Sequence, residues 1–264
     1  MGGAGALRFI SFLTMFALLA WAEYVWPRRR LTLAKSPRWL CNLAITILDA
    51  GVVTLASPLL PVAMATLAGI RGWGCFNLLE LPYWIEFGLS VLALDLLIYL
   101  QHRLFHRIPF FWRFHRMHHT DLDLDVSSGS RFHPLEIALS LLIKSGAVLL
   151  LGAPVLAVLV FEIILNAISL FNHANLRIPL AVDFWLRRWI VTPDMHRVHH
   201  SIIPEETDSN FGFNLPWWDK LLGSYCDQPR HGHDGMVIGL KEFRDPQRLG
   251  LLALLSLPFR GRKG

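Results

Sequence analysis

The chain has 264 residues, of which 53% are hydrophobic and only 17% are charged, and its formal net charge is +5. A mean hydropathy of +0.42, with apolar runs close to the ~20 residues that span a bilayer, indicates a polytopic membrane protein and not a soluble one. The basic residues gather at the ends of apolar runs, as in PRRRLTLAKSPR, so we expect lipid headgroups and no nucleic acid as acidic partners. Three cysteines without a Cys-x-x-Cys spacing exclude a disulfide framework and a thiolate zinc site.

The first apolar segment, residues 6–26, predicts a transmembrane helix that is retained. It is too long for the apolar region of a signal peptide, and Trp21, Tyr24 and Trp26 at its end are typical of a membrane interface. Three arginines follow at 28–30. We therefore expect the N-terminus outside and the C-terminal end of this helix at the cytoplasm.

The second apolar stretch, residues 39–70, contains Pro58 and Pro61. We expect one spanning helix before the prolines and an irregular or interfacial piece after them. The third stretch, residues 81–100, brings the chain back to the cytoplasmic side, where the first histidines follow.

The fourth apolar stretch, residues 135–171, carries the sequence GAP at 152–154. Histidine clusters precede and follow this stretch, so for one shared site the chain must cross the membrane an even number of times or not at all. We therefore expect a helical hairpin that turns at the GAP sequence. Lys144 and Glu162 lie at similar depth on its two arms, and we predict that they pair because an isolated charge there is costly.

From His173 onward the chain becomes polar and aromatic, which predicts a cytoplasmic cap against the membrane surface. The apolar stretch 248–259 is too short to span and should rest in the interface. No flexible linker divides the sequence, so we expect one domain over residues 1–264. The predicted fold class is an all-α, polytopic membrane helical bundle with a cytoplasmic helical cap that holds a histidine-rich dimetal site.

Eight of the twelve histidines fall in three clusters with helical spacing. Residues three and four apart are neighbours on an α-helix, so each His-x-x-His-His triplet should place three imidazoles on one helical face. Imidazole suits iron, zinc, copper or nickel, and eight rings exceed what one ion can hold, so we expect two metal ions. His133 and His173, at the two ends of the hairpin, are further candidates, whereas His231 and His233 are expected in a solvated loop. The clusters are His102-x-x-x-His106, His115-x-x-His118-His119 and His196-x-x-His199-His200.

The identity of the metal separates the functional hypotheses. A structural zinc site usually contains cysteine, a transporter needs ligands along a membrane path, and haem needs histidines that face each other across a bundle. A redox-active iron pair that uses dioxygen explains why the site borders lipid. Two alternatives stay open: a non-redox zinc-dependent hydrolase or lyase with Asp121 or Asp194 as its acid or base, and a non-catalytic metal-binding membrane protein.

Five segments between residues 80 and 247 carry a resemblance to a known family. They are DLLIYLQHRLFHRIPFFWRFHRMHHTD, SRFHPLE, FNHANL, TPDMHRVHHS and NFGFNLPWWDKLLGSY, and in this order they closely resemble the fatty acid hydroxylase/sterol desaturase superfamily of membrane di-iron oxygenases. The resemblance implies an oxidoreductase that hydroxylates or desaturates a lipid (sterol or hopanoid, fatty acyl or related) with dioxygen. It implies two iron ions, which zinc can replace in a purified protein. Carried over by position, the ligands are His102, His106, His115, His118, His119, His173, His196, His199 and His200, with His133 as a histidine that only some branches keep.

Some members of the family have a further histidine four residues before the one that matches His173. Ser169 stands there in this chain, so we expect an open or water-filled position on one iron. The sequence has no Gly-x-Gly-x-x-Gly element and no recognisable haem or iron–sulfur domain, so electrons should come from a small reductant or a separate protein such as a ferredoxin, a cytochrome b5-like protein or a reductase. We expect a multi-pass protein of the bacterial inner membrane, or of the endoplasmic reticulum in a eukaryote, with its active site on the cytoplasmic side.

Carboxylates near the clusters are candidates to orient the imidazoles. Asp95 shares one helix stripe with His102 and His106, and we expect it either to accept an imidazole N–H or to pair with an arginine of the bundle. Arg116 and Arg197 are candidates for contact with a headgroup or an electron donor, or are solvated. Further candidates for the role of Asp95 are Asp121, Asp194 and Asp208, while Asn210, Asn214, Trp218 and Asp219 are expected to pack the cap.

Overall fold

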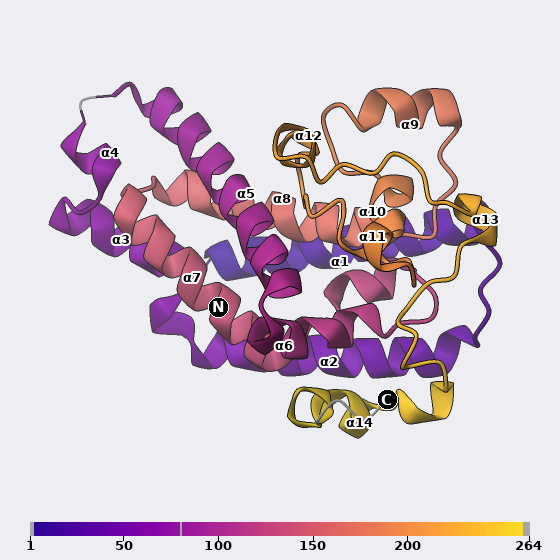
Figure 1. Cartoon of the computed structure of the whole chain (residues 1–264). Coiled ribbons are helices and arrows are strands. Elements are labelled where there is room, and N and C mark those ends of the chain that lie inside the picture. Colours follow the sequence, from indigo (N-terminus) through magenta and orange to yellow (C-terminus); the bar gives the residue numbers. More distant parts are fainter. Residues whose placement is uncertain (1–2, 80, 261–264) are drawn as a thin grey trace.

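The computed structural model of the chain describes residues 3–79 and 81–260, so the outermost ends of the predicted 1–264 domain lie outside the described residues. Helices form almost all of the fold (Figure 1), and the described residues form two isolated bridges but no strand. The long helices are α1 (Gly3–Val25), α2 (Lys35–Leu55), α5 (Tyr83–Arg107), α7 (Pro134–Leu151) and α8 (Val155–His173). The short ones are η1 (Ser57–Leu59), α3 (Pro61–Arg71), α4 (Cys75–Leu78), α6 (Pro109–His119), η2 (Val126–Ser130), α9 (Leu180–Leu186), α10 (Pro193–His199), α11 (Pro204–Thr207), α12 (Trp217–Leu221), α13 (Gly232–Gly235), η3 (Pro246–Arg248), α14 (Leu251–Leu255) and η4 (Leu257–Phe259).

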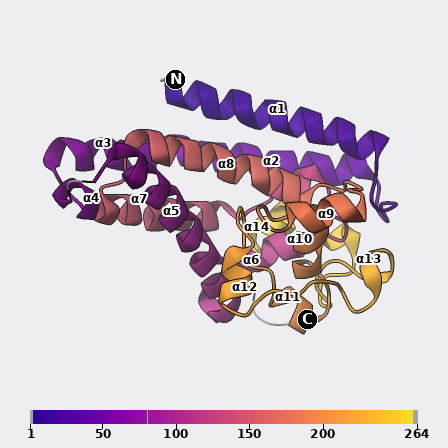
Figure 2. The same ribbon diagram turned by 90° about the horizontal axis from the view of Figure 1, so that it is seen from above.

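The five long helices are each long and apolar enough to cross a membrane. They coincide with the four apolar stretches of the sequence, of which the fourth forms two helices, and the prediction of an all-helical integral membrane protein is confirmed. Helix α8 is the most enclosed of the five and α1 the least. Figure 2 shows why: α1 lies along the outside of the bundle, beside α8.

The segment that follows α2 is more regular than expected. Pro58 lies in the 3₁₀ turn η1, and Pro61 is the first residue of α3, which packs against α7. Proline suits the first position of a helix because its φ is already helical and the N–H that it lacks would have no partner there. The two prolines therefore separate two helices, and the piece after them is helical.

The hairpin turns at the predicted GAP sequence, because α7 ends at Leu151 and α8 begins at Val155. Gly152 adopts a φ of +68°, and a Cβ atom there would lie 2.5 Å from the Asn77 side-chain nitrogen and 2.6 Å from the Trp73 carbonyl oxygen. Only glycine combines the positive φ with such a close approach of the α4 region. The turn returns the far end of α8 to the side of the bundle where α7 began.

Lys144 and Glu162 do not form the predicted direct ion pair, although the charge of Glu162 still attracts the Lys144 ammonium. Glu162 of α8 instead accepts a hydrogen bond from the guanidinium of Arg8 in α1, at 2.7 Å. A charge at membrane depth needs a partner, but a neighbouring helix can supply it as readily as the other arm of the hairpin. The pair joins the outer helix α1 to the enclosed helix α8.

An apolar core holds α5 against the hairpin, and the cap forms beyond the core. Leu94 and Ile98 of α5 pack with Val148, Val158 and Phe161, and α5 then continues past this core to carry the first histidines. Helices α9 to α13 gather around the same end of the bundle (Figure 1). The last turns of α5, the start of α7 and the end of α8 are thereby brought together under the cap.

The apolar stretch 248–259 lies against α2 and α6. Leu254 and Leu257 are buried with Ile45 of α2 and Met117 of α6, while Leu252 and Phe259 stay exposed. One side of this segment is therefore packing for the bundle, and the other side is available to the membrane interface.

Candidate metal centre

Nine histidines converge in two neighbouring groups. Their imidazole nitrogens lie within 4.8 Å of one another in each group, which is the reach of ligands around one metal ion. The ligand role of these residues stays a prediction, but the structure brings together nine of the ten histidines proposed from the sequence. The His102 group contains His102, His106, His115, His119 and His199, and the His118 group contains His118, His173, His196 and His200.

Each His-x-x-His-His triplet is divided between the two groups, contrary to the expectation of three rings on one face. His115 and His119, four residues apart, belong to the His102 group, whereas His118 between them belongs to the His118 group. In the second triplet the assignment is reversed: His199 belongs to the His102 group, whereas His196 and His200 belong to the His118 group. On an α-helix, the residues three and four positions after a given residue lie on opposite sides of the line that runs from that residue along the helix axis. Each triplet is therefore placed to bind both ions of a pair.

The spacing of the Nε2 atoms fits metal coordination. In the His102 group the Nε2 atoms of His102 and His115 are 3.1 Å apart. In the His118 group, His173 lies 3.0 Å from His118 and 3.2 Å from His196, again between Nε2 atoms. Two nitrogens bound at right angles to one ion at ~2.1 Å are ~3.0 Å apart.

Buried nitrogens without partners point to the same conclusion. The Nε2 atoms of His106, His119 and His199 are buried, and no described residue of the chain accepts or donates a hydrogen bond there. A buried polar atom without a partner costs free energy, so such atoms in a folded protein need an explanation. A metal ion held by the His102 group would satisfy all three.

The opposite nitrogen of most rings is held by the protein. The Nδ1 atoms of His102 and His199 donate to the carbonyl oxygens of Phe211 and Ser209, at 2.8 and 2.7 Å. Hydrogen bonds of this kind fix the tautomer that leaves Nε2 free to bind a metal ion. In the His118 group, His118 Nδ1 lies 3.1 Å from the Arg131 carbonyl oxygen and His173 Nδ1 lies 2.7 Å from the Ser169 carbonyl oxygen.

Two carboxylates also hold rings of the His102 group. Glu136, at the start of α7, accepts from His115 Nδ1 at 2.7 Å and is 4% exposed. Asp208, one of the acids named from the sequence, accepts from His106 Nδ1 at 3.2 Å but is mostly exposed. Glu136 is not among the acids predicted from the sequence. The sequence feature that points to it is an acidic residue three positions after His133 in SRFHPLE, where the first helix of the hairpin begins.

The other three predicted carboxylates do not contact an imidazole of either group. Asp95 accepts from the indole N–H of Trp218, at 2.8 Å, and from the Leu215 N–H, at 3.3 Å. Asp121 and Asp194 are instead bound by arginines. The expectation that these three acids orient imidazoles is therefore wrong, because their hydrogen bonds go elsewhere. Groups of the cap bind Asp95, Arg38 of α2 binds Asp121, and Arg28 and Arg197 bind Asp194.

Asp95 and Asp219 fix the cap loop over the site. Asp219 is fully buried and accepts from the N–H groups of Phe211 and Gly212, both at 2.8 Å. Burial raises the pKa of Asp219 to about 6. The Phe211 carbonyl oxygen is the acceptor for His102, so Asp219 positions this ligand through the loop, in agreement with a packing role.

The buried network around Arg38 supports the His118 group. Arg38 of α2 binds Asp121 through two hydrogen bonds, at 2.8 and 2.9 Å, and Asp125 at 2.7 Å. Arg131 lies in the same network and donates to Thr120 at 2.7 Å. The guanidinium of Arg38 holds the pKa of Asp121 well below its usual range, although burial alone would raise it. This network positions the Arg131 carbonyl oxygen that accepts from His118.

His133 lies outside both groups. Its Nδ1 atom accepts from the Leu135 N–H at the start of α7, and its Nε2 atom lies 3.1 Å from the Leu255 carbonyl oxygen. Both nitrogens are thus engaged in capping a helix and in holding the C-terminal segment. We leave His133 out of the proposed ligand set.

Two other residues near the centre differ from expectation. Arg197 is buried and paired with Asp194, so it is neither solvated nor exposed to a partner. His233 is also buried, 3.7 Å from Asp194, whereas His231 is exposed as expected. An aromatic contact was missed as well: Phe132 stacks on the His118 ring with centroids 4.4 Å apart.

Burial lowers the pKa of the six triplet histidines, because a positively charged ring at these positions would lose its hydration by water. For His115 burial lowers the pKa to about 3. At neutral pH the rings are uncharged, which is the form of imidazole that binds a metal ion. Burial, and after it the neighbouring rings, hold the pKa well below its usual value for His118, His119, His196, His199 and His200.

A helical membrane bundle with two adjoining all-histidine groups defines the class: an integral membrane protein with a candidate dimetal centre. Residues 87–224 match the fatty acid hydroxylase family, and the chain belongs to this family. This stretch includes both triplets and most of the cap. The recognition from sequence motifs is confirmed.

Named relatives agree with this assignment. The chain is 30% identical to ornithine lipid hydroxylase OlsE of Rhizobium tropici, over 96% of this chain and 76% of that protein. It is 25% identical to the alkylglycerol monooxygenase of Danio rerio and 26% identical to that of Homo sapiens, of which it covers 48% and 40%. The chain therefore spans about three quarters of the first relative but less than half of the two monooxygenases. No solved structure is significantly similar to the chain. Family and relatives make the chain an oxidoreductase of the lipid hydroxylase type.

Proposed function

We propose that the chain is a di-iron oxygenase that hydroxylates a C–H bond of a membrane lipid with dioxygen and electrons from a separate donor. The observation that carries the proposal is the division of each histidine triplet between the two groups. This arrangement would couple two metal ions within one centre, in a chain that belongs to the fatty acid hydroxylase family. Hydroxylation is favoured over desaturation because the relatives are named as hydroxylases and monooxygenases.

In this proposal the His102 group holds one iron and the His118 group holds the other. When bound, the iron pair supplies the redox chemistry that dioxygen activation needs. The chain itself orients the Nε2 lone pairs through Nδ1 hydrogen bonds and keeps the rings neutral by burial. The His118 group has four histidines, whereas the His102 group has five. This difference fits the open position expected on one iron. Ser169 stands where some members of the family have a further histidine, and its hydroxyl donates to the Gly129 carbonyl oxygen, at 2.8 Å.

The surroundings of Asp121 and Asp194 disfavour a zinc-dependent hydrolase that would use either residue as its acid or base. A hydrolase needs a carboxylate or a similar group that is free to exchange protons near the metal. Both acids considered for that role, Asp121 and Asp194, are bound by arginines, which hold the pKa of each below its usual value although burial opposes this. Such carboxylates are poor bases, and their oxygens are already occupied.

The proposal extends to location and partners. We place the centre at the cytoplasmic side of the bacterial inner membrane, because three arginines follow the aromatic end of α1 on that side. A ferredoxin, a cytochrome b5-like protein or a reductase would deliver the electrons. Residues 1–264 act as one domain, since the groups draw on α5, α6, α8 and α10 together.

The direct test is oxygen incorporation. Membranes that contain the iron-loaded chain and a reductant are supplied with ¹⁸O₂, and lipids are analysed by mass spectrometry. We expect a hydroxylated lipid that carries one ¹⁸O atom, lost in His173→Asn and retained in the exposed control His231→Asn. Lipids without ¹⁸O, from protein that contains iron and is folded, would contradict the proposal.

A further inference from the structure

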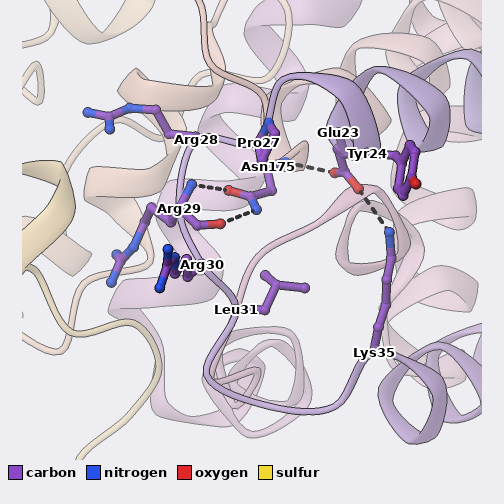
Figure 3. Close-up of a pocket in the computed structure, with 9 residues that line it drawn as sticks. All are labelled: Glu23, Tyr24, Pro27, Arg28, Arg29, Arg30, Leu31, Lys35 and Asn175. Atoms are coloured by element: carbon purple, nitrogen blue, oxygen red, sulfur yellow. Dashed lines mark hydrogen bonds and ion pairs between the residues drawn. The ribbon is translucent and has the colours of Figure 1, made fainter.

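A hollow of about 550 Å³ lies at the end of α1, where the chain leaves the bundle for α2 (Figure 3). The neighbouring Trp21, Tyr24 and Trp26 are 59%, 85% and 54% exposed. Exposed aromatic side chains at a helix end are typical of the level of the lipid headgroups. The lining residues are Glu23, Tyr24, Pro27, Arg28, Arg29, Arg30, Leu31, Lys35 and Asn175.

Two of the four cations around the hollow are held by the cap. Arg28 binds Asp194 at 3.2 Å and Asp234 at 2.8 Å, and Arg29 donates to the Met236 carbonyl oxygen at 2.9 Å. In Figure 3 both guanidiniums extend to the side away from Lys35. These two arginines anchor the wall of the hollow.

Of the other two cations, Arg30 is available to a ligand, and Lys35 makes only a long contact to Glu23 and a cation–π contact to Trp39. Arg30 is exposed and has no ion-pair partner within the described part of the chain. The Lys35 ammonium reaches only to 3.8 Å from Glu23. This contact is to Glu23 Oε2, since Glu23 Oε1 accepts from the N–H groups of Val126 and Asn175, at 2.6 and 2.7 Å. The ammonium also lies 4.4 Å from the centre of the Trp39 ring. The hollow therefore carries an excess of positive charge beside apolar surface.

The hollow adjoins the His118 group through two chain connections. Asn175, in its wall, lies two residues after His173, and its side chain accepts from Arg29 N–H at 3.0 Å and donates to the Arg29 carbonyl oxygen at 2.8 Å. Arg28 is tied to Asp194, two residues before His196. A group bound in the hollow would thus be held at a fixed position relative to this side of the centre.

We propose that the hollow binds the anionic headgroup, a phosphate or carboxylate, of a membrane lipid, with Arg30 and Lys35 as its cationic contacts. Resting on the proposed function, the same contact selects lipids with an acidic headgroup as substrates and presents their chains to the metal centre. Each cation near the membrane surface strengthens attraction to an anionic lipid about fivefold, so the two together contribute ~10- to 30-fold.

The first experiment measures binding alone, on the full chain in neutral detergent. Native mass spectrometry compares the occupancy of dioleoyl phosphatidylglycerol with that of dioleoyl phosphatidylcholine, and sodium phosphate serves as a competitor. We expect a preference of ~10- to 30-fold for the anionic lipid, reduced to less than ~3-fold in Arg30→Gln/Lys35→Gln. The control is Arg248→Gln, an exposed cation outside the hollow, which should keep the preference.

Three results would overturn the proposal. An undiminished preference in the double variant removes the site, and an equal loss in the control reduces it to general surface charge. Displacement by millimolar phosphate assigns the hollow to a soluble oxyanion instead of a lipid. A second experiment, hydroxylation of the two lipids in the ¹⁸O₂ assay, tests substrate selection: equal hydroxylation of both lipids contradicts selection by the headgroup. The membrane ¹⁸O₂ assay decides the proposed function, and the binding result decides the hollow.

Discussion

Glu136 offers the sharpest test of how the protein prepares its metal ligands. Its carboxylate is buried and holds His115 Nδ1 at 2.7 Å. Replacement by glutamine keeps the volume but removes the negative charge that strengthens His115 as a ligand. Loss of such a supporting carboxylate typically lowers metal affinity by ~10- to 100-fold, which corresponds to ~1.4 to 2.7 kcal/mol. We expect Glu136→Gln to lie in this range.

The matched control is Asp208→Asn, at the other carboxylate of the His102 group. Asp208 is 3.2 Å from His106, and its side chain is 63% exposed. Water screens an exposed pair, so its loss should cost ~0.2 to 1 kcal/mol, or less than ~6-fold in affinity. Metal affinity is measured by competition with a chelator, with circular dichroism as the check of folding. Equal effects of the two substitutions, or no effect of Glu136→Gln in a folded protein, would refute this reasoning.

Three further outcomes follow from the structure. Gly152→Ala should destabilise the bundle by ~1 to 3 kcal/mol, because of its positive φ and the close Asn77 side chain; an unchanged thermal unfolding midpoint in detergent would be inconsistent with this. Asp219→Asn should cost ~1 to 3 kcal/mol, since it leaves a backbone N–H such as that of Phe211 without its acceptor, and hydrogen exchange at the loop should rise; protection equal to wild type would count against it. Metal-free protein should lose stability as the pH falls from 7 to 5: burial lowers the pKa of His115 and of the other triplet histidines below the unfolded value of 6.5, so the unfolded state binds more protons in that window. A constant midpoint across the window would argue against neutral buried rings.

The helices were predictable because they follow from local chemistry. Apolar runs of membrane length, the prolines at 58 and 61, and the GAP turn locate the ends of α1, α2, α7 and α8 closely. The helicity of α3 is not evident from Pro58 and Pro61, because proline can end a helix or begin one, and here Pro61 begins α3.

The spacing of the histidines predicted the candidate site but not its division into two groups. Residues three and four apart do share a helical face, yet they lie on opposite edges of it, and two ions can use the two edges separately. Only the packing of α5, α6, α8 and α10 decides which ring joins which group.

Partners of buried charges could not be read from the sequence, because they come from distant parts of the chain. Glu162 pairs with Arg8, Asp121 with Arg38, and Asp95 with Trp218. Glu162 and Asp95 lie on the expected helices and Asp121 follows α6, but the partner of each depends on which element packs against it. The same limit explains why Glu136 was overlooked.

The central claim is that the two histidine groups hold a pair of irons that act together. The most direct measurement is Mössbauer spectroscopy with metal analysis, on protein expressed with ⁵⁷Fe and purified without oxygen. The account predicts about two irons per chain, coupled to each other and oxidised together by dioxygen. A single iron per chain, or two that fail to react with dioxygen after reconstitution, would contradict it.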